Sequence, residues 1–146
     1  GDWGIVKWQH RVFSGGPTVN VAAQRGRPGS ILEHYRVLLT LRRRYEVLRR
    51  GNLKFISSVR RRADVVAYSR SMGSGSGERA LIVVNPSDEA MNWPVPRRFR
   101  RYCLAYGNYQ ASSAAAAPDA AAGLLPEAVA GKALILEPWE ARVYLA

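Results

Sequence analysis

The chain of 146 residues has enough apolar material for one compact core, since 47% of its residues are hydrophobic and 23% are charged. A chain of this size excludes a large enzyme architecture that is complete within it. The formal net charge is +11 and the pI is about 10.7, a balance that makes nucleic acid or an anionic membrane surface the first partner to consider. The basic excess is uneven, because 20 of the 22 Lys and Arg residues lie within the first 101 positions.

The single cysteine, Cys103, excludes an internal disulfide and any metal site built from several cysteines. It lies in the apolar run 102–106, so we expect a buried small side chain rather than a reactive thiol. No run approaches the roughly 20 apolar residues that span a bilayer, and no targeting signal is visible. The sequence starts at Gly1 without a methionine, which suggests a fragment of a longer protein and leaves the localisation of that parent unknown.

A helix is the first regular element that the sequence predicts, after an irregular connection over residues 1–29. Ser30 and Glu33 have the spacing of a capping box, in which the serine hydroxyl accepts from the amide of residue 33 and the glutamate reaches back to the amide of residue 30. Apolar residues then recur at helical spacing as far as Leu48, and Gly51 supplies a stop. We therefore expect one helix over residues 31–50.

The pattern changes after Gly51 to short runs rich in β-branched and aromatic residues, which predict an antiparallel β unit of about 95 residues. The expected strands are 53–59, 65–71, 80–85, 101–106, 133–136 and 142–145. Residues 73–77 alternate glycine and serine and predict a hairpin tip, while the alanine-rich residues 111–123 predict a loop or a helical turn. Pro94 and Pro96 indicate an edge or a loop rather than a central strand.

Side chains suited to catalysis or metal binding are scarce. Neither His10 nor His34 has a second histidine or a carboxylate at the four-residue spacing of a zinc-binding helix, so we expect surface or hydrogen-bonded roles for both. Glu137 and Glu140 bracket a Pro-Trp turn, a weak match to the carboxylate pair about 5 to 9 Å apart that a glycosidase uses. We therefore predict no catalytic, cofactor-binding or metal-binding residue in this chain.

The arginine runs allow two interpretations. Runs 42–44 and 49–50 fall near the end of the predicted helix, where cations meet the helix dipole favourably. Run 60–62 falls at an expected hairpin tip, and residues 97–101 surround Phe99, a basic and aromatic mixture that suits a β-barrel binding single-stranded nucleic acid. We favour ordinary solvated loops over nucleic acid as a partner, because the aromatic residues do not alternate along strands.

Two stretches resemble a known family when their order is considered. Residues 19–24 read Val-Asn-Val-Ala-Ala-Gln, and residues 29–43 continue as Gly-Ser-Ile-Leu-Glu-His-Tyr-Arg-Val-Leu-Leu-Thr-Leu-Arg-Arg. This order is similar to the segment leading into the last barrel helix of α-glucosidases and oligo-1,6-glucosidases of the α-amylase family, glycoside hydrolase family 13. Residues 134–144 resemble the closing strand pair of the family's C-terminal β-domain, and residues 64–70 and 80–87 resemble its paired strands.

The resemblance covers about residue 19 to the end and implies an α+β fragment. Residues 1–50 would be the end of a catalytic (β/α)₈ barrel with its last helix, and residues 51–146 would be an antiparallel β-sandwich domain. The family's catalytic carboxylates lie upstream of the matching stretches, so none carries over to this chain and the fragment alone is expected to be inactive. The implied partners are the parent's catalytic barrel and, for the intact parent, an α-linked oligosaccharide substrate, with no cofactor.

Other parents fit the same stretches, namely a trehalose synthase or a non-catalytic relative such as the heavy-chain subunit of amino-acid transporters. Whichever parent applies, it would be cytoplasmic if bacterial and secreted or membrane-anchored if animal. Residues 1–18 and 111–123 depart from the family pattern. The helix is expected to dock on the barrel and on the sheet at once, with Ile31 and Tyr35 on one side and Leu39 on the other.

Overall fold

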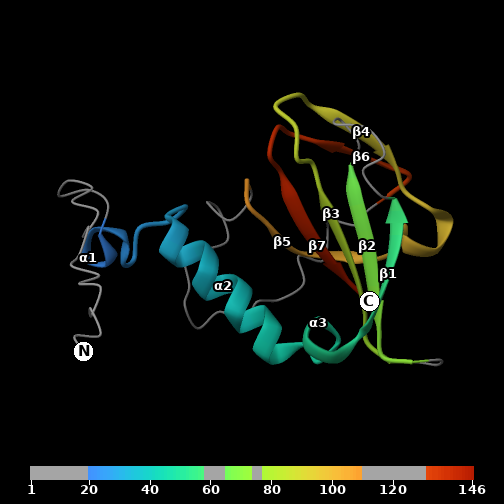
Figure 1. The fold of residues 1–146 in the computed structure, drawn as a ribbon, viewed down its shortest axis with the longest axis horizontal. Coiled ribbons are helices and arrows are strands. Elements are labelled where there is room, and N and C mark those ends of the chain that lie inside the picture. Colours follow the sequence, from blue (N-terminus) through green and yellow to red (C-terminus); the bar gives the residue numbers. More distant parts are fainter. Residues whose placement is uncertain (1–19, 58–64, 74–76, 110–130) are drawn as a thin grey trace, which may run out of the picture.

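The computed structural model describes residues 20–57, 65–73, 77–109 and 131–146 (Figure 1). Expectations for residues 1–18, His10, the arginine run 60–62, the centre of the glycine-serine tip and the alanine-rich residues 111–123 lie outside this part. Three helices come first: α1 (Val21–Gln24), α2 (Ile31–Arg44) and α3 (Val47–Arg50). Among the described residues, no helix is long and apolar enough to cross a membrane.

In the described part of the chain, seven strands and one short 3₁₀ helix follow. They are β1 (Asn52–Ser57), β2 (Val66–Ser71), β3 (Arg79–Val84), β4 (Met91–Pro94), η1 (Arg97–Phe99), β5 (Cys103–Gly107), β6 (Ala133–Leu136) and β7 (Ala141–Leu145). The expected strand over 101–106 begins two residues late, because η1 and the turn after it occupy the preceding residues. β4 was missed in the sequence, and its last residue, Pro94, agrees with the expected edge position because β4 pairs on one side only.

At the start of α2, one of the two hydrogen bonds of the predicted capping box is present. The hydroxyl of Ser30 accepts a hydrogen bond from the amide of Glu33 at 3.4 Å. The carboxylate of Glu33 accepts from the amide of Gly26 at 2.9 Å instead of from Ser30, because the chain turns back at Gly26, whose φ of +71° is open to glycine at no steric cost. The glutamate therefore ties the preceding loop to the helix as well as favouring its N-terminus.

The prediction of one helix over 31–50 is wrong, because the helix breaks at Tyr45. Tyr45 has extended backbone angles, and α3 restarts at Val47, whose amide donates to the carboxylate of Glu78 at 3.0 Å. Val47 is fully buried in a cluster with Ala80 and other residues of the sheet. Packing on the sheet and a capping carboxylate from another part of the chain thus override the continuous helical pattern.

The strands form two antiparallel sheets, one of five strands in the order β1-β2-β3-β7-β5 and one of β4 and β6 (Figure 1). β7 lies between β3 and β5, so the strand nearest the C-terminus joins the edge strand β5 to the rest of the large sheet. β6 and β7 are consecutive but belong to different sheets, so the turn between them connects the two layers.

The main core lies between the large sheet and the layer formed by β4, β6 and η1. Its buried residues are Val65, Ala67, Leu81, Val83, Trp93, Val95, Phe99, Tyr102, Leu104, Leu134, Leu136 and Tyr144. Residues of β3, β6 and β7 alternate into this core as the period of two requires. Cys103 is half-buried at the start of β5 rather than fully buried as expected, because it lies on the opposite face of the sheet from Leu104.

Two neighbouring residues of β6 test the placement of this core. Leu136 is fully buried and Ile135 is 66% exposed. We expect Leu136→Ala to lower the free energy of unfolding by about 2–5 kcal/mol, since it removes buried methyl groups and leaves a cavity. Ile135→Ala should change it by less than about 1 kcal/mol. Urea unfolding of both variants provides the measurement, and equal losses would show that the alternation of β6 is misplaced.

Candidate interface

The second face of the large sheet is apolar and only partly covered. Strand register places one apolar residue of each strand in a row across this face, in the order Phe55, Tyr68, Ile82, Val143 and Tyr106. α3 packs over the middle of the sheet through Val47, and Phe55 at the edge stays 60% exposed. This face therefore extends beyond the helix that covers it.

Helix α2 carries a second exposed apolar surface. Ile31, Tyr35, Leu38 and Leu39 are all exposed, by 67% at Ile31. At 100° per residue these four lie within about 100° of the helix circumference, whereas Leu41 points to another side and is buried. The expectation that Ile31 and Tyr35 lie opposite Leu39 is therefore wrong. They form one exposed stripe, which we call the α2 stripe.

The contact between His34 and Tyr106 joins α2 to the sheet. The imidazole Nδ1 lies 2.7 Å from the tyrosine hydroxyl, and the two rings meet edge to face with centroids 6.1 Å apart. Burial raises the pKa of Tyr106, which keeps its hydroxyl protonated. The predicted hydrogen-bonded role of His34 is confirmed. Within the described ranges, no group of three or more His, Cys, Asp or Glu residues gathers as a metal site would require.

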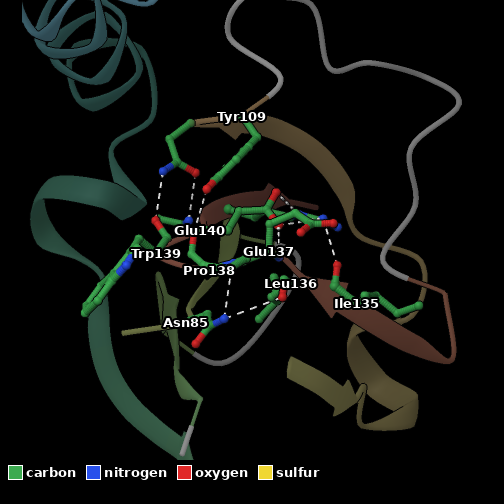
Figure 2. A network of polar contacts seen from close by, with 11 residues as sticks. Asn85, Tyr109, Ile135, Leu136, Glu137, Pro138, Trp139 and Glu140 are labelled. Atoms are coloured by element: carbon green, nitrogen blue, oxygen red, sulfur yellow. Dashed lines mark hydrogen bonds and ion pairs between the residues drawn. The ribbon is translucent and has the colours of Figure 1, made fainter. Parts of the chain in front are cut away.

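An exposed tryptophan stands at the turn between β6 and β7. Trp139 has a φ of +58°, a left-handed conformation that costs energy for a residue with a Cβ. Its amide donates to the carbonyl of Ser87 at 3.0 Å, its carbonyl accepts from Asn108 at 2.9 Å, and the hydroxyl of Tyr109 donates to Pro138 at 2.7 Å. Figure 2 shows the indole pointing away from this network, and Trp139 is 62% exposed.

Buried ionic contacts hold the same turn. The carboxylate of Glu140, which is almost fully buried, accepts from Arg142 Nε at 2.7 Å and Nη2 at 2.9 Å and from the amide of Glu137 at 2.8 Å. Burial by itself lowers the pKa of Arg142, but the hydrogen bonds and charge interactions with Glu140 and Tyr144 together outweigh this and the pKa is raised. Glu140 and Arg142 are thus a structural ion pair, and Glu137 is exposed.

Asn85 is the polar centre of this region, and the sequence analysis missed it. Its side chain is fully buried, and both its amide nitrogen and its amide oxygen make hydrogen bonds. Nδ2 donates to the carbonyls of Glu89 and Glu137, and Oδ1 accepts from Ser87. Figure 2 shows the contact of Asn85 with Glu137. An asparagine followed by proline at the end of an apolar strand was the available signal, since such a residue commonly ends a strand in a turn.

The basic residues around Phe99 do not form a stacking surface. Phe99 is 3% exposed, packs edge to face against Tyr102, and has the guanidinium of Arg98 4.7 Å from its ring centroid. A base cannot stack on a ring that is already covered. The structural role of Phe99 is to complete the main core.

Comparison with known proteins relates these surfaces to a family. No family model matches the chain. A probable alpha-glucosidase of Rhizobium meliloti (strain 1021) is 33% identical over 78 residues, which are 53% of this chain and 13% of that protein. A solved MutB variant from crystals soaked with trehalulose is 28% identical with a TM-score of 0.66, covering 90% of this chain and 21% of its own. A MutB variant in complex with sucrose is 30% identical with a TM-score of 0.64, over 86% and 19%.

The chain corresponds to the C-terminal portion of an α-glucosidase- or trehalulose synthase-like protein of glycoside hydrolase family 13. The expected fold, a short helical part followed by antiparallel β-sheets, is confirmed for this family 13 portion. It spans about a fifth of the length of the solved relatives. The α2 stripe and the exposed edge of the sheet at Phe55 are therefore surfaces of one portion of a larger protein.

Replacing Glu140 tests the importance of the β6–β7 turn in the family 13 portion. We expect Glu140→Gln to lower the free energy of unfolding by roughly 3 kcal/mol, because it leaves the guanidinium of Arg142 in a protein environment without its counter-charge. Glu46→Gln is the matched control, since it removes the carboxylate of an exposed pair with Arg50 and should cost less than about 1 kcal/mol. Thermal and urea unfolding report both changes, and a stability loss no larger than that of the control would contradict this role.

Proposed function

We propose that this chain is the non-catalytic part of a glycoside hydrolase and that it stabilises the parent's catalytic barrel. In this proposal, residues 1–50 complete the barrel with its last helix, and residues 51–146 form the β-domain that packs beside it. The observation that carries the proposal is the α2 stripe, an apolar helix surface that the rest of the described chain leaves exposed. A helix of a globular protein normally buries such a stripe against another element.

The energetics favour a large covering surface. Burying a Leu, Ile or Tyr side chain contributes about 1.5–3 kcal/mol, so covering the α2 stripe stabilises the assembly by several kcal/mol. A neighbouring barrel provides that cover, while the adjoining side of α2 holds the β-domain through the contact between His34 and Tyr106. α2 would then contact both parts and fix the position of the β-domain relative to the barrel.

The parent is proposed to hydrolyse α-glucosidic bonds of oligosaccharides by the retaining route with two carboxylates. The likeness to a probable alpha-glucosidase supports this activity. Isomerisation of sucrose is the second candidate, because the trehalulose synthase structures match most of this chain. A trehalose synthase or a transporter subunit as the parent rests on the sequence resemblance alone.

The exposed stripe predicts self-association of the isolated chain. We expect oligomers in light scattering, because exposed apolar patches of several hundred Å² promote association. The double variant Ile31→Lys/Leu39→Lys should shift the population towards monomer, whereas Val21→Lys, an exposed apolar residue on α1, should not. A monodisperse monomer for the unaltered chain would contradict the proposal and indicate a self-sufficient domain.

Activity measurements test whether this chain is non-catalytic while the intact parent is active. The 146-residue chain should not hydrolyse p-nitrophenyl α-glucoside, whereas the product of the full reading frame should hydrolyse this substrate and maltose. Formation of trehalulose from sucrose by the full product would favour the second candidate. Hydrolysis by the 146-residue chain alone would overturn the assignment of a non-catalytic role.

A further inference from the structure

A basic groove of about 200 Å³ opens at the margin of the sandwich, between the edge of the large sheet and η1. Phe99 and Tyr102 contribute to its lining, and both are buried in the main core. The polar lining of the groove includes Lys54, Ser69, Ser71, Arg79 and Arg98. None of the described residues that line the groove is acidic.

Strand register brings most of these side chains to one face. Lys54 pairs with Ser69 across β1 and β2, and Ser71 pairs with Arg79 across β2 and β3. Because side chains alternate between the two faces of a strand, these four residues lie on the same face of the sheet as Leu81, which pairs with Ser69. This face is apolar under the small sheet and becomes polar and cationic where that cover ends.

The third cation comes from outside the sheet. The guanidinium of Arg98 lies over the ring of Phe99, an attraction that favours one orientation of the arginine. Arg70 also lines the groove, but its guanidinium donates to the carbonyl of Gly51. Lys54, Arg79 and Arg98 therefore bring positive charge to the groove from three segments, and Ser71 adds a hydroxyl group, whereas the hydroxyl of Ser69 donates to the carbonyl of Lys54.

We propose that this groove binds a small oxyanion with phosphate or sulfate chemistry. Ammonium, guanidinium and hydroxyl donors converging on one small cavity suit the several acceptor oxygens of such an anion. A nucleic acid would need a row of cations along a phosphate backbone, and one compact groove with a covered aromatic floor does not provide it. The site is independent of the activity proposed for the parent.

Titration of the full 146-residue chain with inorganic phosphate, at constant ionic strength and followed by calorimetry or NMR, tests the site. Lys54→Gln and Arg98→Gln should each weaken phosphate binding by roughly fivefold, since each removes a charged donor. Lys132→Gln and Arg97→Gln are the matched controls, because both residues are exposed and neither lines the groove. Their effect should stay below about twofold.

Glucose 1-phosphate and glucose serve as further probes of the ligand. Equal binding of phosphate and glucose 1-phosphate would support recognition of the oxyanion alone, and tighter binding of the sugar phosphate would support a phosphorylated sugar as its source. Absence of phosphate binding, or equal weakening in groove and control variants, would overturn the proposal. Tight oligonucleotide binding with equal losses in all four variants would overturn it as well, in favour of a diffuse basic surface.

Discussion

The large sheet carries apolar side chains on both faces, so both faces need a cover. β4, β6 and η1 cover one face and form the main core, while α3 covers part of the other through Val47. This requirement explains why the helical segment breaks at Tyr45, since a straight helix could not both lie across the sheet and extend away from it. It also explains why apolar surface remains exposed in a chain that spans about a fifth of its solved relatives.

The turn from β6 to β7 joins the two layers. Its buried polar groups all need hydrogen-bond or ionic partners. Asn85 at the end of β3 and the ion pair of Glu140 with Arg142 provide them. Buried polar groups of this kind stabilise a structure only when each partner is present. Their arrangement holds Trp139 in a left-handed conformation with its indole exposed, so this hydrogen-bonded turn also presents a large aromatic surface.

Charge in this protein serves several local purposes. Arg42 to Arg44 occupy the last turn of α2, where they favour the helix dipole, and Arg142 neutralises a buried carboxylate. Lys54, Arg79 and Arg98 line one groove. A high net charge therefore need not indicate nucleic acid binding, because its meaning depends on where the individual side chains gather.

Local patterns in the sequence determined the start of α2 at Ser30, the positions of most strands and the resemblance to family 13, because capping, alternation and motif order depend on neighbouring residues. The break at Tyr45, the half-buried state of Cys103 and the short strand β4 were decided by packing partners distant in sequence. Packing partners distant in sequence also decided the candidate interface and the groove. Strand register brings Lys54, Ser69 and Arg79 to one face, and no local pattern specifies which strands become neighbours. Tertiary structure also decided that the stripe of Ile31, Tyr35 and Leu39, which helical spacing places on one side of α2, stays exposed, because exposure depends on what the rest of the fold covers.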